Sequence, residues 1–461
     1  MHTAPEADAL SAELRGLRDA ERISSWALFP QPYDAPMAGG TSLPRRLLPD
    51  HHSVVDGRLF IGGCDVEALC AEFGTPLFVY DEQHLRDRCR EAVETFGDGV
   101  AYATKAFLCR AMAKLAHEEG MELDVATAGE LHVALAAGVP ASRLVLHGNN
   151  KSIAELAMAR EAGVGRIVVD SFDELDRLDG LHAADGRTPK VLLRITPGVK
   201  AETHEFVMTG QEDSKFGFGL HSGAAGSALE RAGAAASVDL VGIHVHIGSQ
   251  VFVAENFGRA VEVMAPFVAG VDLPEFSIGG GLGVAYVEGE TAPTISEWGS
   301  WIIDGCRKAG ITARVSAEPG RSIVAQAAIT CYSVGTVKEI PGVRTYVSVD
   351  GGMSDNPRPV LYGSGYETFL PRAVDARRDR LVRVVGKHCE SGDLLVPDAS
   401  VPDDLVVGDI LATPVTGAYG HSMGSNYNKV LRPAVVFCHD GDARVVVRRE
   451  TLDDLLVTDE G

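Results

Sequence analysis

The sequence lacks several features that mark exported and membrane proteins. Its eight cysteines are scattered without a CxxC pair, and no secretory leader stands at the start of the chain. We therefore expect reduced thiols and a cytoplasmic protein. No apolar run approaches the roughly 20 residues that a membrane-spanning helix requires, so the sequence predicts no membrane segment.

Basic side chains are scarce relative to acidic ones. The chain of 461 residues has 42 lysines and arginines against 64 aspartates and glutamates, which gives a formal net charge of −22. Such a charge repels phosphate backbones and anionic lipid, so we do not expect nucleic acid or a membrane surface as a partner. Any site for an anionic ligand must then be built locally from arginines, lysines and backbone N–H groups.

Two sequence patterns alternate in the middle of the chain. From residue 76 to about residue 328, short apolar runs alternate with longer amphipathic stretches, which is typical of a parallel sheet covered by helices. Eight candidate strands are found at residues 100–103, 123–125, 144–146, 167–169, 191–195, 240–243, 275–278 and 314–317. Almost all of them end in a polar or glycine-rich patch, where a (β/α)8 barrel assembles its site. We therefore expect an α/β fold with a TIM-like (β/α)8 barrel rather than a doubly wound open sheet.

The rest of the chain predicts a second domain. After residue 328, alternating strands such as residues 344–349 and 443–447 are separated by Gly, Pro and Asp turns, which favours an antiparallel β domain over residues 329–461. The barrel is then expected to span residues 76–328. Residues 51–75 are expected to contain a strand that pairs with the C-terminal β domain, and residues 1–50 to form a partly disordered N-terminal extension.

Two of the barrel strands are followed by residues suited to an aldehyde cofactor and its phosphate. Lys105 follows the first strand beside small residues, where partial desolvation would favour Schiff-base formation, although most lysines are simply solvated. The run at residues 279–283, with Gly279, Gly280 and Gly281, either lets backbone N–H groups approach a phosphate or forms only a tight turn. It lacks the GxGxxG spacing of a dinucleotide site.

Two further strands of the predicted barrel are followed by a carboxylate, an arginine and two histidines. Glu318 is suited to keep a pyridine nitrogen protonated and Arg321 to clamp a carboxylate, but the pair could also merely close the barrel mouth. His244 and His246 share one face of a strand. A metal site is the rival interpretation of these histidines. No third ligand follows at a zinc-like spacing and no HExxH pattern occurs, so no metal is expected.

Two candidate site residues in the predicted β domain can each be interpreted in two ways. Cys389, next to Glu390, is either packing material or a thiol brought over a cofactor. Tyr419 is either a phenol bound to phosphate or an ordinary half-buried aromatic residue.

Together these segments make the sequence resemble the fold type III pyridoxal-phosphate decarboxylases, and within them the diaminopimelate decarboxylases. The similarity runs from about residue 52 to the C-terminus. Its most specific pieces are YATKAF at 102–107, HVHIGSQ at 244–250, GGGLG at 279–283, EPGR at 318–321, DGGMSDNPRPVLY at 350–362, CESGD at 389–393 and GAYGHSMGSNYN at 417–428. The resemblance implies an alanine racemase-like architecture of a barrel with a β domain, and pyridoxal 5'-phosphate as cofactor.

The same resemblance implies a role for each candidate residue. Lys105 would hold the cofactor covalently, His246 would stack on its ring and Glu318 would pair with its pyridinium. The remaining cofactor-binding residues would be Ser249, Gly279, Gly280, Gly281, Arg321 and Tyr419. The substrate-binding residues would be Arg321, Arg358, Tyr362, Tyr419 and Glu390, the last of these for the distal ammonium. Cys389 would donate a proton from the neighbouring subunit, which implies a homodimer with a shared site.

The reaction implied is the decarboxylation of meso-2,6-diaminopimelate to L-lysine and carbon dioxide, the last step of lysine biosynthesis. Glu390 favours this substrate, because a zwitterionic distal end needs an anion for its ammonium as well as a clamp for its carboxylate. Arg321 and Arg358 would remain unpaired around an amino acid without a distal carboxylate. The alternatives are a related decarboxylase that acts on ornithine, lysine or a specialised amino acid, an alanine racemase-like isomerase, and a non-catalytic, cofactor-binding regulatory homologue.

Overall fold

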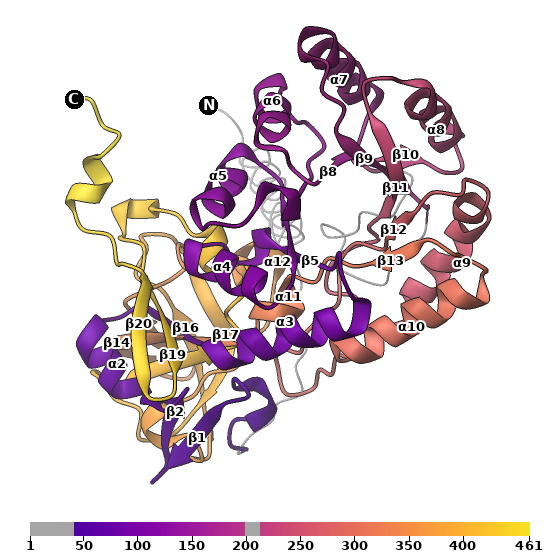
Figure 1. The fold of residues 1–461 in the computed structure, drawn as a ribbon. Helices are drawn as coiled ribbons and strands as arrows, with labels where there is room; N and C mark the ends of the chain where they lie inside the picture. Colours follow the sequence, from indigo (N-terminus) through magenta and orange to yellow (C-terminus); the bar gives the residue numbers. More distant parts are fainter. Residues whose placement is uncertain (1–40, 199–212) are drawn as a thin grey trace, which may run out of the picture.

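The computed structural model describes residues 41–198 and 213–461, and within them eight parallel strands form a barrel (Figure 1). In chain order they are β5 (Ala101–Ala103), β6 (Glu122–Val125), β7 (Leu144–Leu146), β8 (Arg166–Val169), β9 (Lys190–Thr196), β11 (Asp239–Val245), β12 (Glu275–Ser277) and β13 (Arg314–Ser316). The backbone N–H of Ala101 donates to the carbonyl of Ala317 at 3.0 Å, which ties the first strand to the last. The eight strands expected from the sequence are confirmed.

Helices cover the outside of the barrel. They are α3 (Glu82–Phe96), α4 (Arg110–Glu118), α5 (Ala128–Ala136), α6 (Ile153–Ala162), α7 (Phe172–Asp185), α8 (Ala224–Ala234), α9 (Glu255–Ala269) and α10 (Ile295–Lys308). Capping boxes start two of them, Ser152 with Glu155 at α6 and Thr294 with Glu297 at α10. Each such cap satisfies otherwise free N–H groups and fixes the loop that leads from a strand into its helix. The short β10 (Phe218–Gly219) extends the sheet beside β9.

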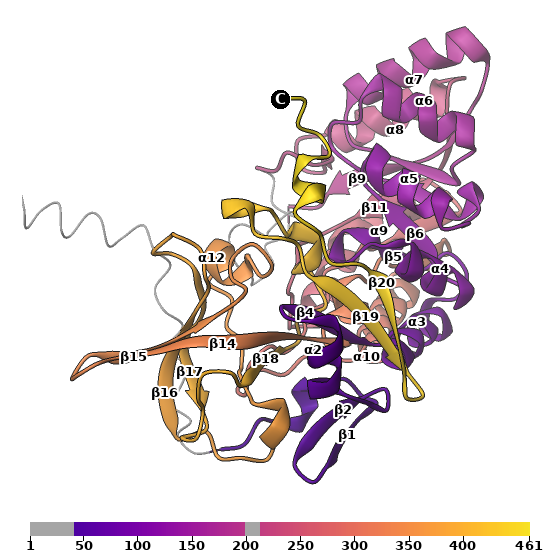
Figure 2. The ribbon, with the colours of Figure 1, turned by 90° about the vertical axis from the view of Figure 1, so that its left-hand side faces the viewer.

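A second sheet lies beside the barrel (Figure 2). Its strands run in the order β17-β16-β15-β14-β4-β19-β20, and β18 also pairs with β14. The bounds are β4 (Leu77–Asp81), β14 (Ala328–Ile340), β15 (Arg344–Val349), β16 (Arg380–Val385), β17 (Leu394–Val401), β18 (Ile410–Pro414), β19 (Ala434–His439) and β20 (Asp442–Val447). Most pairs are antiparallel, as predicted, but β15 with β16 and β4 with β19 are parallel.

The segment before the barrel differs from our expectation. We expected a strand within residues 51–75 to pair with the second domain. Instead β1 (His52–Val55), β2 (Arg58–Ile61) and β3 (Cys64–Asp65) pair with one another, and α2 (Val66–Phe73) follows. The physical reason is the Asp56-Gly57 turn between β1 and β2, where both residues have positive φ and fold the chain into a hairpin. The strand that joins the second sheet is β4, which we had assigned to the barrel.

The described part of the predicted N-terminal extension is packed. Leu43, Leu47 and Leu48 are buried, and Leu47 ends the short helix η1 (Arg45–Leu47). The side chain of Gln326 donates to the carbonyl of Leu48 at 3.0 Å. Residues 1–40 lie outside the described residues, so the prediction of disorder in the extension is not tested there.

The remaining helical segments are short. They are η2 (Thr104–Ala106), η3 (Ala141–Arg143), α11 (Arg321–Val324), α12 (Arg358–Tyr362), η5 (Pro371–Ala373), η6 (His421–Met423), η7 (Tyr427–Lys429) and η8 (Asp453–Leu456). Among the helices that the structure describes, none combines the length and the apolar character needed to span a membrane.

Candidate active site

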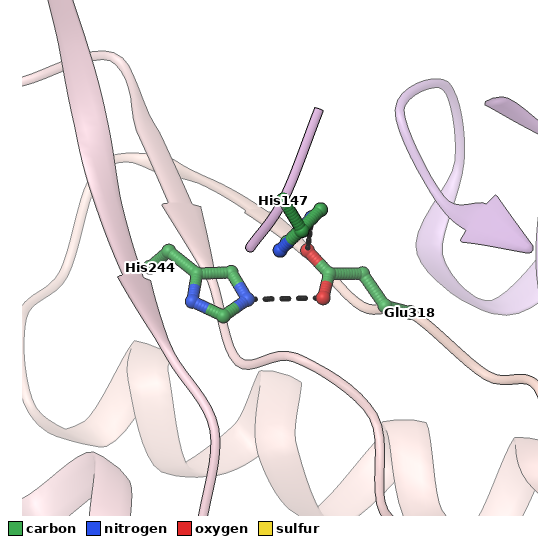
Figure 3. A group of neighbouring side chains, drawn as sticks. All are labelled: His147, His244 and Glu318. Carbon is green, nitrogen blue, oxygen red and sulfur yellow. Dashed lines mark hydrogen bonds and ion pairs between the residues drawn. The ribbon is translucent and has the colours of Figure 1, made fainter. Parts of the chain in front are cut away.

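Glu318 is the centre of a buried polar cluster at the carboxyl end of the barrel strands. Its two carboxylate oxygens face two imidazole rings (Figure 3): His244 Nε2 lies 2.9 Å from one oxygen and His147 Nε2 lies 3.5 Å from the other. The Ser277 hydroxyl donates to the carboxylate at 2.9 Å. Burial alone would raise the pKa of this carboxyl, but the two histidines and the hydrogen bonds from His244 and Ser277 outweigh burial and lower it. Glu318 is therefore an anion held inside the barrel.

His147 and Ser277 are members of this cluster that the sequence analysis did not predict as site residues. His147 follows β7, whereas His244 lies in β11, and the barrel brings the two rings to a centroid distance of 5.0 Å. Nitrogen and oxygen atoms of His147, His244 and Glu318 lie within 4.8 Å of one another. Spacing along one segment does not reveal such a group, because its side chains come from different strands. Burial lowers the pKa of His147, so its ring is neutral near neutral pH.

Lys105 and Asp124 lie near this cluster. Lys105 is in η2, directly after β5, and its charge acts on both Asp124 and His147. The Asp124 carboxyl lies 3.7 Å from His147 Nε2, and its pKa is raised by burial first and by the charge of Glu318 second. Our expectation that Lys105 is partly desolvated is wrong for this structure, because its side chain is exposed. The amine is thus open to a reactant from solvent.

The glycine run forms a turn packed against the loop that follows β11. A Cβ atom at Gly279 would lie 2.5 Å from the Val245 carbonyl, and one at Gly281 would lie 2.3 Å from the Gly248 carbonyl. Larger residues are therefore excluded by backbone atoms. The N–H of Gly280 donates to His246 Nδ1 at 3.2 Å, which leaves that ring nitrogen without a proton. His246 is thereby fixed beside the turn, and burial lowers its pKa.

Arg321 and Arg358 form an arginine cluster with three tyrosines. Arg321 donates to the Tyr286 hydroxyl at 2.7 Å and to Ser249 at 3.0 Å, and its guanidinium lies 4.7 Å from the Tyr419 ring centroid. The Arg358 guanidinium lies over the Tyr286 ring, 4.2 Å from its centroid. It also donates to the Tyr366 hydroxyl. Both arginines are buried, which makes them a strong local positive site in a negatively charged protein.

Tyr286 and Tyr366 were also missed by the sequence analysis. Tyr286 lies in the loop after the glycine run and Tyr366 lies after α12, in another domain. Their rings meet edge to face at 5.2 Å. Tyr366 lies only four residues beyond the DGGMSDNPRPVLY segment, which was the one sequence signal pointing to this region. Tyr362 ends α12, on the same helical face as Arg358.

A loop of the second domain reaches the residues around Lys105. The N–H of Tyr419 and the hydroxyl of Ser422 both donate to the carbonyl of Ala106, at 2.8 and 3.1 Å. Gly417 packs so closely that a Cβ atom there would lie 1.8 Å from the Val324 carbonyl. The structure thus brings Tyr419 to the same mouth as Lys105, Glu318 and Arg321.

Cys389 and Glu390 lie elsewhere, in the loop between β16 and β17. Both are exposed. Cys389 donates its backbone N–H to Asn428 at 3.0 Å, and the Glu390 carboxylate accepts from Gly392 at 3.2 Å. Within the described ranges, no hydrogen bond or ion pair joins either residue to the Lys105 loop of the same chain.

The residues at the barrel mouth fit pyridoxal phosphate. Glu318 is a buried anion, as the ring nitrogen requires. Arg321 Nε is buried and finds no hydrogen-bond partner in the part of the chain that the structure describes. The backbone N–H of Gly281 likewise donates to no described group, so the glycine turn suits a phosphate and the Arg321 guanidinium suits an anionic group of a bound ligand. The exposed Lys105 amine suits the aldehyde.

Comparisons with known proteins agree with this site. Residues 82–325 match the family model described as the pyridoxal binding domain of pyridoxal-dependent decarboxylases. The chain is 48% identical over 426 residues to the diaminopimelate decarboxylase of Mycobacterium tuberculosis, covering 87% of this chain and 94% of that protein. It is 45% identical over 423 residues to that of Bacillus subtilis, with coverage of 87% and 95%. The crystal structure of the M. jannaschii diaminopimelate decarboxylase in complex with L-lysine aligns with a TM-score of 0.84 at 32% identity, over 90% and 98% of the two chains.

Proposed function

This chain belongs to the diaminopimelate decarboxylases, a branch of the pyridoxal-dependent decarboxylases, and we propose which of its residues bind the cofactor, bind the substrate and donate the proton. The reaction removes carbon dioxide from meso-2,6-diaminopimelate and leaves L-lysine. Bound pyridoxal phosphate supplies an aldehyde for amines and a protonated ring that accepts electrons. The observation that carries the proposal is that Lys105, Glu318 and the glycine turn share one mouth of the barrel.

Glu318 and its neighbours hold the charge that the reaction needs at the ring nitrogen. Because Glu318 is buried and anionic, it stabilises a proton on a nitrogen placed against it. His244 and Ser277 occupy both carboxylate oxygens and so fix the orientation of that charge. His246, held by the Gly280 N–H, provides a flat neutral surface at the same mouth.

The arginine cluster selects the substrate. We assign the distal carboxylate of the substrate to Arg321, Arg358 and Tyr362, with Tyr286 and Tyr366 orienting the two guanidinium groups. An amino acid without that carboxylate leaves two buried cations unpaired. A site built to bind a polar group rejects analogues that lack it by roughly 10⁴-fold. Ornithine and lysine are thus expected to be poor substrates.

Cys389 and Glu390 complete the site of a second copy of the chain in this proposal. Cys389 donates the proton that replaces carbon dioxide, and Glu390 binds the distal ammonium. Support comes from their exposure and from their place in the β16–β17 loop, where their described hydrogen bonds involve the second domain alone. The active unit is accordingly a homodimer. Sedimentation of the holoenzyme tests this: a monomer with full activity contradicts a shared site.

We also place the reaction in the cytoplasm. All eight cysteines are free thiols. Cys64 lies beside Cys438 and Cys70 lies beside Cys331, and neither pair is joined by a disulfide. A reducing compartment keeps such pairs in this state. Fractionation of the producing cells, with activity followed in each fraction, tests the assignment.

The substrate is tested by measuring carbon dioxide release from meso-diaminopimelate, its LL isomer, L-lysine and L-ornithine. We expect release from the meso compound alone. Comparable release from lysine or ornithine would instead support a related decarboxylase, and a change of configuration without gas would support an isomerase. Borohydride treatment should fix the cofactor to Lys105, with Lys105→Ala as the matched control.

A further inference from the structure

The last four residues of the GAYGHSMGSNYN segment have a role that the proposed chemistry does not use. The Oδ1 atom of Asn428 accepts the backbone N–H of Cys389 at 3.0 Å. The two residues are 39 positions apart, so this bond joins two separate loops of the second domain. Asn428 itself has φ 51° and ψ 23°. That left-handed conformation is one that asparagine tolerates better than most residues, which explains why this residue type suits the turn.

The residue before Cys389 is fixed from the other side. His388 is buried, and its backbone N–H and its Nδ1 both bond to Asp393 Oδ2 at 2.9 Å. The other Asp393 oxygen accepts from the N–H of Met353 at 2.6 Å. Asp393 is the final residue of the CESGD segment and is itself buried. The loop that carries Cys389 is thus folded around a carboxylate with three donors.

The turn that contains Asn428 also contacts His388. The His388 ring stacks on the Tyr427 ring with a centroid distance of 5.6 Å and an angle of 7° between the planes. Tyr427 precedes Asn428, so one turn holds the side chain of His388 and the backbone of Cys389 at once. The turn is tied down in its own right, because Asn426 donates to Glu450 at 2.6 Å. The Cys389 residue stays exposed while its own backbone N–H and the residue before it are held.

We propose that Asn428 and Asp393 are positioning residues that aim the Cys389 thiol for proton delivery. This inference rests on the proposed function, in which that thiol reaches the site of the partner subunit. A proton donor acts efficiently only within hydrogen-bond reach of its target. An exposed cysteine on an unrestrained loop would spend little time in that geometry, and a misplacement of about 1 Å can cost about 100-fold in rate.

Two substitutions of Asn428 separate its hydrogen bond from its backbone conformation. Asn428→Gly removes the acceptor and permits the left-handed conformation, whereas Asn428→Asp keeps an acceptor oxygen at the same position. Asp440→Gly is the matched control, because Asp440 also has a positive φ of 50° and lies in the β19–β20 hairpin. The holoenzyme of each variant is compared by kcat, KM and amide hydrogen exchange of the peptide spanning residues 386–394.

Asn428→Gly should lower kcat by about 10- to 100-fold with little change in KM, and should speed amide exchange in the peptide. Asn428→Asp should restore most of both values, and Asp440→Gly should match the wild type. Unchanged exchange in Asn428→Gly overturns the proposal, as does faster exchange with unchanged kcat. A wild type that releases no carbon dioxide from diaminopimelate refutes the proposed function instead, and the exchange comparison still decides whether Asn428 holds the loop.

Discussion

Replacing Tyr286 with phenylalanine removes one hydroxyl from the arginine cluster and keeps the ring on which Arg358 stacks. That hydroxyl accepts a 2.7 Å hydrogen bond from Arg321 Nη1, and both residues are buried. The substitution therefore leaves a charged donor without its partner in a site that little water reaches. A hydrogen bond to a charged group contributes about 1.5–3 kcal/mol, and we expect Tyr286→Phe to lower the free energy of unfolding by that amount.

Two other buried tyrosines provide the comparison. The Tyr366 hydroxyl accepts from Arg358, so Tyr366→Phe should cost a similar amount. Tyr80 donates to the carbonyl of Gly417 at 2.7 Å, which is a neutral hydrogen bond worth about 0.5–1.5 kcal/mol. The three variants share the same chemical change, but the Tyr286 and Tyr366 hydroxyls accept from a charged donor whereas the Tyr80 hydroxyl donates to a neutral carbonyl.

Urea unfolding of the three variants measures the difference. At equal slopes of the transition, a shift in the urea midpoint reports a change in stability. Tyr286→Phe should shift the midpoint about twice as far as Tyr80→Phe, and it should also raise the KM for diaminopimelate because Arg321 loses its orientation. If Tyr286→Phe costs no more than Tyr80→Phe, the reasoning from buried charge is refuted.

Four further predictions concern single residues. Lys105→Ala should abolish carbon dioxide release without lowering the melting temperature, because the side chain is exposed; residual turnover would refute its role. Cys389→Ala should retain the absorbance of bound cofactor but slow product formation by about 100-fold, and full activity would remove it as the proton donor. Arg358→Ala should chiefly raise the KM for diaminopimelate, and an unchanged KM would exclude it from the substrate site. His84 is buried, and burial first of all lowers its pKa to about 4. Because this is below the unfolded value of about 6.5, its stabilisation is present above pH 6.5 and is lost as the pH falls to 4, by about 3 kcal/mol; His84→Gln should flatten this acid-side loss of melting temperature.

The barrel was accessible to sequence reasoning because its strands are short apolar runs with polar ends. The hairpin at residues 52–61 was missed although its signal was present. Asp56-Gly57 between two apolar segments is the dipeptide that a tight hairpin turn requires. The apolar pattern by itself predicts one strand, whereas the Asp56-Gly57 dipeptide predicts two strands joined by a turn.

Only part of the active site could be predicted from the sequence, for a different reason. Lys105, Glu318 and the glycines each follow a strand, so their common edge could be deduced from the barrel. The contact of His147 with His244 depends on side-chain direction, and the contact of Tyr286 with Tyr366 depends on the docking of the second domain. Exposure of the Lys105 side chain is likewise set by its surroundings and not by the small residues beside it in sequence.

The place of β4 has a consequence for how this chain is made. All five residues of β4 are buried, and its neighbours in the sheet are β14 and β19, both of which are synthesised after the entire barrel. During synthesis on the ribosome, both edges of β4 stay unpaired until β14 and β19 have emerged. A fragment that starts at residue 329 would have the opposite defect, because β14 and β19 would each present a bare edge. Such edges template aggregation, so the two halves should be produced as one polypeptide.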